Sequence, residues 1–282
     1  MEENNKDKRE RKKISRRDAI KSLATVPVLG AVAYGIYRKK TYDQFLRESI
    51  QGELNMSQDV PVAPPASNGK LIRLGLIGFG IRGKQLAQAL GFAHPSQVAE
   101  WWKAAETGDT RYRTFREQDD LNVRITAVCD IFNTYGRMSQ ETAANVNREV
   151  TVGNKGDEVI RYSNYKELIA SPDVDAVVIA TPDHWHGPMT IEAARAGKHV
   201  YCEKPMTWTV DETYEVRKAV KESKIIFQLG HQGRQTDSYI KAKEAIQKDI
   251  LGEVTLIEVT TNRNDPNGAW VYPIHEDAIK IQ

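Results

Sequence analysis

The sequence has only two cysteines, Cys129 and Cys202, among its 282 residues. They do not show the short ligand spacing of a zinc site, so no metal is expected. Each cysteine lies in an apolar stretch typical of a buried strand. We therefore expect two buried free thiols, although the sequence leaves a disulfide between them open. Cysteine content does not indicate a cellular compartment.

The sequence also lacks a strong excess of charge of either sign. Residues 1–21 contain nine Lys and Arg against five Asp and Glu, and subtracting this +4 from the net charge of +2 leaves −2 for the rest. A nucleic-acid-binding fold needs a clustered basic face, so no nucleic-acid partner is expected. A hydrophobic content of 40% with 28% charged residues is ordinary for a soluble protein, and the length allows one large domain or two smaller ones.

The apolar run at residues 23–37 is too short for a comfortable membrane span of about 20 residues. It follows the paired Arg16 and Arg17, as in a twin-arginine export signal, and Ala31-Val32-Ala33 offers a signal-peptidase site. We therefore expect residues 1–41 to be such a signal and the protein to be exported to the periplasm. Positive charge just beyond the cleavage site opposes translocation, which leaves an uncleaved membrane anchor or a basic tail before a core helix as alternatives.

A glycine-rich turn directly follows the apolar run at residues 71–77 and leads into a helical pattern. The turn consists of Gly78, Phe79, Gly80, Ile81, Arg82 and Gly83. Gly78 permits a tight turn, Gly80 lets a pyrophosphate approach the backbone, and Gly83 lets the helix pack on the strand. The helix N-terminus would offer free N–H groups to the phosphates. This order predicts a dinucleotide site.

Asp130 ends a second predicted strand at residues 123–129. Its carboxylate could accept hydrogen bonds from both ribose hydroxyls of the adenosine, which favours NAD over NADP, although Arg137 could compensate the charge of a 2′-phosphate. Asp130 lies well beyond the usual ~20 residues after the glycines. We therefore predict that residues 91–122 are an insertion made of an extra helix and a loop. We expect its tryptophans to be packed, with an exposed contact surface as the alternative.

Strand and helix patterns alternate after a predicted linker at residues 42–69. Further strands are predicted at 159–162, 174–180, 199–202 and 225–229, and helices at 135–146, 165–170, 187–196 and 211–222. We predict an α/β fold with a doubly wound parallel Rossmann sheet over residues 70–234. A helix at 238–250 and a strand at 254–260 would begin a second α/β domain, incomplete in residues 235–282.

Polar clusters follow three of the predicted strands, where ligands bind in open α/β sheets. They are Thr181-Pro182-Asp183-His184-Trp185-His186, then Glu203-Lys204-Pro205, and then Gly230-His231-Gln232-Gly233-Arg234. Each residue alone could have a local role, such as a helix cap at His184, a solvated Lys204 or a surface ion pair at Arg234. All three clusters together favour a single crevice.

These motifs, in this order and spacing, resemble the Gfo/Idh/MocA-type oxidoreductases, the family of glucose–fructose oxidoreductase and inositol dehydrogenase, over roughly residues 70–260. The run 183–186 is similar to the exported branch of that family, whose members often carry twin-arginine signals. The resemblance implies an NAD cofactor and hydride transfer from a sugar or polyol substrate.

The resemblance also implies residue roles. Lys204 would lie near the nicotinamide and polarise the reacting hydroxyl, and His186 would line the nicotinamide pocket, so both are candidate catalytic residues. Glu203 and Pro205 would shape the Lys204 loop, and Arg234 would border the cofactor or substrate. The candidate cofactor contacts in the three clusters are Thr181, Pro182, His184, His186, Glu203, Lys204, Pro205, Gln232 and Arg234.

The family pattern is incomplete at the C-terminal end. Relatives continue into a mostly antiparallel sheet that forms the substrate floor and the dimer face, and they supply an Asp-x-x-x-His acid/base pair. His275-Glu276-Asp277 has the wrong order for that pair. We therefore expect a fragment, which would form a homo-oligomer only with the complete domain. A glycoside-cleaving relative with transient NAD redox chemistry and a non-catalytic NAD-binding module remain alternative functions.

Overall fold

The computed structural model describes residues 36–45, 48, 52, 69–144, 158–234, 236–260, 266, 272 and 274–279. The predicted twin-arginine motif and most of the predicted linker lie outside these residues, and residues 36–45, at the end of the predicted signal and the start of the linker, are helical. The chain divides into two compact units, one of residues 62–234 with 259–282 and one of residues 1–61 with 235–258. In the described part of the chain, no helix has both the length and the apolar character needed to span a membrane.

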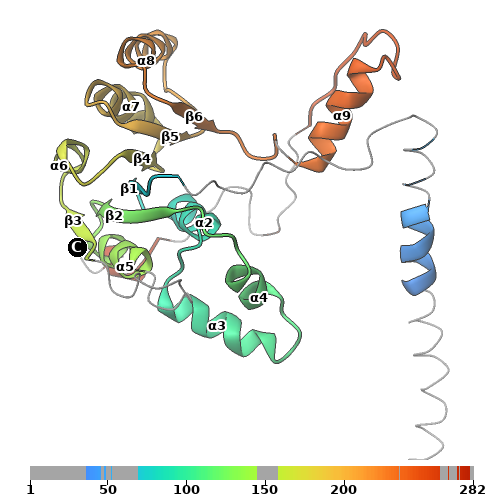
Figure 1. The fold of residues 1–282 in the computed structure, drawn as a ribbon, viewed down its shortest axis with the longest axis horizontal. Helices are drawn as coiled ribbons and strands as arrows, with labels where there is room; N and C mark the ends of the chain where they lie inside the picture. The colour runs from blue at the N-terminus through green and yellow to red at the C-terminus, as the bar shows by residue number, and fades with distance from the viewer. Residues whose placement is uncertain are drawn as a thin grey trace, which may run out of the picture. The chain divides into compact units, whose positions relative to one another are not determined.

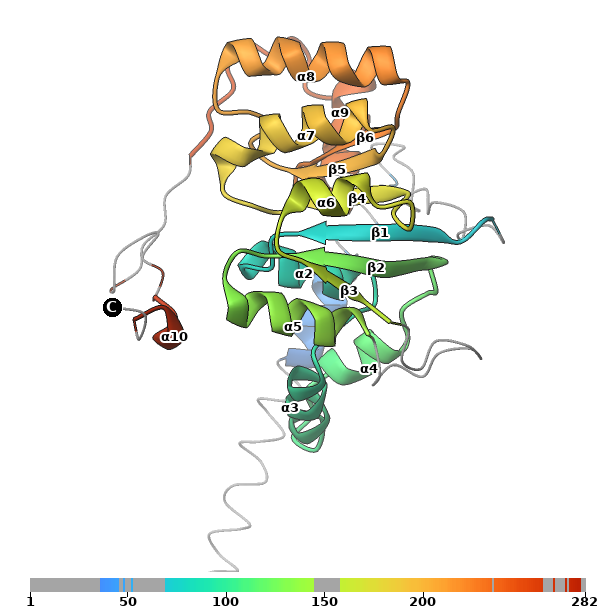
Figure 2. The ribbon, with the colours of Figure 1, turned by 90° about the vertical axis from the view of Figure 1, so that its left-hand side faces the viewer.

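Six parallel strands form one sheet in the order β3-β2-β1-β4-β5-β6, which Figure 2 shows side by side. Their bounds are β1 Ile72–Ile77, β2 Val123–Cys129, β3 Ile160–Tyr162, β4 Ala176–Ile179, β5 His199–Glu203 and β6 Phe227–Gly230. The order reverses beside β1, as in a doubly wound fold. The predicted α/β fold with a parallel Rossmann sheet is therefore confirmed.

Helices cover both faces of this sheet (Figure 1). Their bounds are α2 Ile81–Ala89, α5 Asn133–Ala143, α6 Tyr165–Ala170, α7 His186–Arg195 and α8 Val210–Ser223. Side chains of α6 and α7 share one buried cluster with Ile77, whereas those of α2 and α5 share another with Leu76. Successive β1 residues thus face opposite layers, which is why the strands are almost continuously apolar.

The register of the sheet aligns the carboxyl ends of the central strands. Ile77 pairs with Cys129 on one side and with Ile179 on the other, and Cys202 pairs with both Ile179 and Leu229. The residues that follow these positions therefore emerge at one edge of the sheet. Every polar cluster predicted from the sequence lies at this edge.

The insertion at residues 91–122 contains two helices rather than the single one predicted, α3 Pro95–Ala105 and α4 Arg111–Arg116. They enclose a small core of their own, in which the rings of Trp101 and Phe115 lie 5.5 Å apart. Trp102 remains 58% exposed beside Tyr112. The predicted packing therefore holds for Trp101 and not for Trp102.

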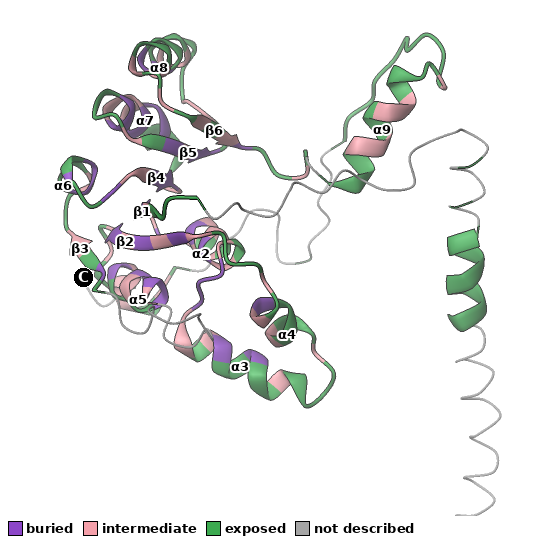
Figure 3. Ribbon diagram, in the orientation of Figure 1, coloured by how far each residue is buried: buried purple, intermediate pink, exposed green. Residues whose placement is uncertain are grey.

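The predicted strand at residues 254–260 is wrong. These residues form no strand, and Leu256 and Ile257 are 80% and 79% exposed. A strand needs a neighbour to pair its backbone groups, and in the described ranges no further strand follows β6. The preceding helix does form, as α9 Asp237–Gln247, and none of its residues is buried (Figure 3).

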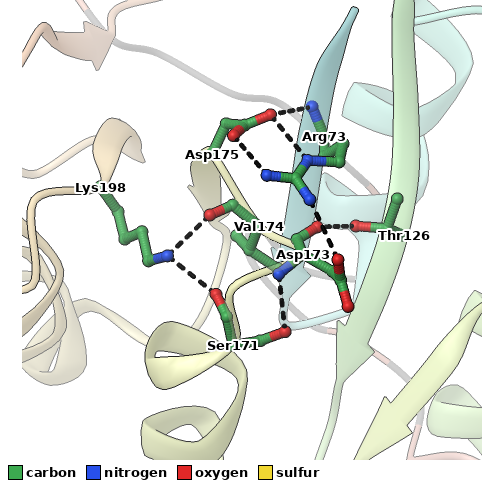
Figure 4. A network of polar contacts seen from close by, with 7 residues as sticks. All are labelled: Arg73, Thr126, Ser171, Asp173, Val174, Asp175 and Lys198. Atoms are coloured by element: carbon green, nitrogen blue, oxygen red, sulfur yellow. Dashed lines mark hydrogen bonds and ion pairs between the residues drawn. The ribbon is translucent and has the colours of Figure 1, made fainter.

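A network of ion pairs ties together the opposite, amino-terminal edge of the sheet (Figure 4). Arg73 donates from Nε and Nη2 to the two carboxylate oxygens of Asp175, at 3.1 and 2.8 Å, and its backbone N–H donates to Asp175 Oδ2 at 2.9 Å. Lys198 Nζ donates to the carbonyls of Ser171 and Val174. The Arg73 hydrogen bonds lower the pKa of Asp175 to about 2.

Candidate functional site

The glycine turn after β1 is shaped by backbone contacts that exclude any side chain. Gly78 has a φ of +88°, and a Cβ there would lie 2.6 Å from the carbonyl oxygen of Ala180. A Cβ on Gly83 would collide with the carbonyl oxygen of Gly78. The backbone N–H of Gly78 donates to the carbonyl oxygen of Cys129 at 2.8 Å. Glycine at these two positions therefore sets helix α2 against the end of β1.

Gly80 differs from the other two glycines, because a Cβ built on it meets no protein atom within 4 Å. It is the N-cap of α2, it provides no side-chain cap, and the first turn of the helix contains no acidic residue. The N–H groups of an uncapped helix N-terminus attract anions. The open space at Gly80 therefore fits a pyrophosphate that lies against the backbone.

Asp130 lies directly after β2, beside this turn. Its Oδ2 accepts a hydrogen bond from Phe79 N at 2.7 Å, and its Oδ1 accepts one from Phe132 N at 2.8 Å. An ionised carboxylate can accept about four hydrogen bonds, so about half of this capacity remains for ribose hydroxyls. The arrangement fits a nucleoside with free hydroxyls.

Lys84, which the sequence analysis does not identify as a site residue, lies near Asp130 and the glycine turn. Its ammonium nitrogen lies 4.6 Å from the centroid of the Tyr135 ring. Burial lowers the pKa of Lys84, and the charge of Asp130 partly opposes this effect. The sequence signal for Lys84 is its place on α2, one residue after Gly83. The turn that begins this helix lies against Asp130, directly after β2.

His186 is only 1% exposed, and both of its ring nitrogens face backbone carbonyls. Nδ1 lies 2.5 Å from the Pro205 oxygen and Nε2 lies 2.9 Å from the Thr181 oxygen. The imidazole therefore bridges the loops that follow β4 and β5. The three preceding residues, Asp183 to Trp185, are exposed.

Glu203 is a buried carboxylate, 3% exposed, at the end of β5. Its Oε1 lies 2.9 Å from Arg82 Nε and accepts a hydrogen bond from Tyr201 Oη at 3.1 Å. Its Oε2 accepts one from Gln232 Nε2 at 3.2 Å. Burial, followed by the charge of Glu203, raises the pKa of Tyr201. The sequence analysis does not identify Tyr201 as a site residue. Its position two residues before Glu203 is the signal for it, because residues two apart on a strand share a face.

The structure thus brings together most of the predicted site residues. Phe79 meets Asp130, Arg82 and Gln232 meet Glu203, and His186 joins Thr181 to Pro205. Residues that are exposed at the same edge are Ile81, Pro182, His184, Lys204 and Arg234. Within the described ranges, no three His, Cys, Asp or Glu side chains are grouped in a way that could hold a metal ion.

Comparison with known proteins agrees with this geometry. The family GFO_IDH_MocA, described as an oxidoreductase family with an NAD-binding Rossmann fold, matches residues 72–231, which is more than half of the chain. A levoglucosan dehydrogenase of Pseudarthrobacter phenanthrenivorans is 35% identical over 108 residues, 37% of this chain and 28% of that protein. An inositol 2-dehydrogenase/D-chiro-inositol 3-dehydrogenase of Shouchella clausii is 32% identical over 135 residues, 48% of this chain and 36% of that protein.

Among solved structures, scyllo-inositol dehydrogenase from Lactobacillus casei with bound NAD(H) and scyllo-inositol is 20% identical, with a TM-score of 0.49. That match covers 66% of this chain and 44% of the other. The chain therefore spans less than half of the length of the relatives it matches here.

Proposed function

The chain belongs to the Gfo/Idh/MocA oxidoreductase family, and from this premise we propose that it binds NAD(H) for hydride transfer on a sugar or polyol. The observation that carries the proposal is the corner formed by Gly80 and Asp130. Gly80 leaves open space at an uncapped helix N-terminus, and Asp130 keeps acceptor capacity beside it. One position suits the pyrophosphate and the other suits the adenosine ribose.

NAD is favoured over NADP by the charge of this corner. Asp130 accepts two backbone N–H bonds, and its remaining lone pairs suit hydroxyl donors. A 2′-phosphate brings only acceptors and negative charge to the same place. Calorimetric titration of the chain with NAD and then with NADP tests this preference, and tighter binding of NADP would refute it.

Lys204 is the residue proposed to act on the substrate. It is exposed directly after β5, at the carboxyl edge of the sheet where the glycine turn, Asp130 and the loop after β4 also lie. Its side-chain nitrogen would bind and polarise the reacting hydroxyl as that hydroxyl loses its proton and its carbon loses a hydride, for which bound NAD would be the acceptor. His186 would position the two flanking loops, because both of its nitrogens already face carbonyl oxygens.

A turnover assay with a panel of sugars and polyols tests this role. Lys204→Ala should keep NAD affinity and lose most of the turnover, whereas normal turnover of the variant would contradict the role. Lys218→Ala, at an exposed position on α8, is the matched control. Cleavage of a glycoside without net NADH would indicate the glycoside-cleaving alternative. Bound NAD with no turnover on any substrate would favour a binding module.

We also propose that residues 1–41 direct export to the periplasm. The paired Arg16 and Arg17 before an apolar run support this proposal. Twin-arginine export carries folded proteins, which suits a chain that must bind its cofactor before it crosses the membrane. N-terminal sequencing of the mature protein tests it, and a cytoplasmic protein that begins at Met1 would contradict it.

A further inference from the structure

Arg82 lies inside the glycine turn, where a guanidinium would ordinarily be assigned to the cofactor phosphates. In the structure it is directed elsewhere. Its Nε lies 2.9 Å from Glu203 Oε1, and its Nη1 donates to Gln85 Oε1 at 2.8 Å. The Glu203 side chain is only 4% exposed against 33% for Arg82. The charge of Arg82 is therefore committed to a buried carboxylate.

Glu203 is held from several directions at once. Besides its ion pair with Arg82, it accepts hydrogen bonds from Tyr201 and Gln232. A Cβ on Gly230 would lie 2.9 Å from Glu203 Oε1 and 2.5 Å from Tyr201 Oη, so the glycine in β6 lets these two side chains pack directly against the backbone. A buried carboxylate without its cation would carry a large desolvation penalty. Arg82 is the residue that compensates this charge.

Lys204 is the next residue after Glu203, and the chain is fixed on both sides of it. Glu203 is attached through its side chain to Arg82 on α2. Pro205 is attached through its carbonyl to His186 on α7. Lys204 itself is exposed, and the contacts of these two neighbours fix the backbone from which its side chain extends.

We infer that Arg82 is a positioning residue that orients Lys204 through Glu203, and that it is not a ligand of the cofactor phosphates. The inference rests on the proposed function, because Lys204 is the group on which the positioning acts. The ion pair between Arg82 and Glu203 would then connect the glycine turn, proposed to bind the pyrophosphate, to Lys204, proposed to act on the substrate.

Two measurements on Arg82→Met and Arg82→Lys separate positioning from phosphate binding. Positioning predicts a dissociation constant for NAD within about threefold of wild type, and a kcat lowered about tenfold or more at little change in KM. Arg82→Lys should recover part of the kcat, because it restores a cation near Glu203. A tenfold weaker NAD affinity with normal kcat at saturating NAD would overturn the inference.

A third measurement does not depend on turnover. Hydrogen exchange of the peptide that spans residues 203–207 should become faster in Arg82→Met, while Arg217→Met, at an exposed position on α8, should leave it unchanged. The double variant Arg82→Met/Glu203→Gln avoids an unpaired buried charge and keeps the test open if the single variant unfolds. Unchanged exchange in Arg82→Met, or in the double variant if Arg82→Met unfolds, would overturn the inference.

The outcomes also separate this inference from the proposed function. If the wild-type chain does not bind NAD, or if Lys204→Ala turns over normally, the proposed function fails, and the inference fails with it. If Lys204→Ala is inactive while Arg82→Met shows normal turnover and exchange, only the inference fails. If the chain binds NAD but shows no turnover, the inference is judged from Arg82→Met alone. Wild-type NAD affinity with faster exchange supports it, and weaker NAD affinity or unchanged exchange contradicts it.

Discussion

Asp175→Asn should destabilise the protein in a pH-dependent way. The hydrogen bonds from Arg73 lower the pKa of Asp175 from 3.8 to about 2. Each pKa unit corresponds to about 1.4 kcal/mol, which gives the charged pair a ceiling of about 2.4 kcal/mol. The Asp175 side chain is 27% exposed, so solvent and salt screening reduce the expected loss to about 1–1.5 kcal/mol at pH 7.

The sign of the pH dependence follows from the direction of the pKa change. A carboxyl whose folded pKa is lowered contributes its full stability above the unfolded pKa and loses it as the pH falls toward the folded pKa. The difference in unfolding free energy between wild type and Asp175→Asn should therefore be constant from pH 7 to pH 5 and fall to about half by pH 3. Urea denaturation at each pH measures it.

Asp173→Asn is the matched control for this experiment. Its carboxylate also contacts Arg73, at 3.0 Å, but is 62% exposed, and its backbone carbonyl keeps the hydrogen bond from Thr126. A surface pair of this kind contributes little, so the control should lose less stability than Asp175→Asn. If Asp175→Asn is no worse than the control, or if its effect does not change between pH 7 and pH 3, the ion-pair reasoning is refuted.

Three further predictions concern single residues. Gly83→Ala should cost about 1–3 kcal/mol, because its Cβ meets the Gly78 carbonyl, whereas Gly80→Ala should keep its melting temperature and weaken NAD binding on calorimetry. Burial raises the pKa of Cys129 to about 11 and of Cys202 to about 12, so Ellman's reagent should label neither until the chain unfolds; rapid native labelling would contradict this. Gly230→Ala should lower kcat and retain NAD affinity, since its Cβ crowds the Glu203 carboxylate; loss of NAD affinity would point instead to direct cofactor contact.

The strands could be predicted from the sequence because the sheet is covered on both faces. Each strand then appears as a continuous apolar run, and the turn residues between runs set the boundaries to within a few residues. The segment at residues 254–260 has the same apolar content but remains exposed. Apolar content shows what a segment could bury, while only a partner strand decides whether it pairs. The same limit applies to the insertion, where a separate small hydrophobic core around Trp101 stabilises a second helix that the sequence pattern did not predict.

The location of the site could be predicted because parallel topology brings strand ends to one edge. The pairings within it could not, since they depend on side-chain direction and on sheet register. Arg82 and Glu203 lie far apart in the sequence, and nothing in either motif requires the 2.9 Å contact between them. His186 shows the same limit, because its spacing after Thr181 did not reveal that both ring nitrogens meet carbonyls.

Asp130 and Glu203 show how burial separates two similar carboxylates. Both end a strand at the same edge, and the sequence assigns both to the cofactor. Asp130 is only partly buried, binds two backbone N–H groups and keeps acceptor capacity, so it can bind an arriving hydroxyl. Glu203 is 3% exposed, is paired with Arg82 and accepts hydrogen bonds from Tyr201 and Gln232, so a ligand could reach it only by breaking a buried ion pair. A change at Asp130 should therefore act on cofactor choice, and a change at Glu203 on the residue that follows it.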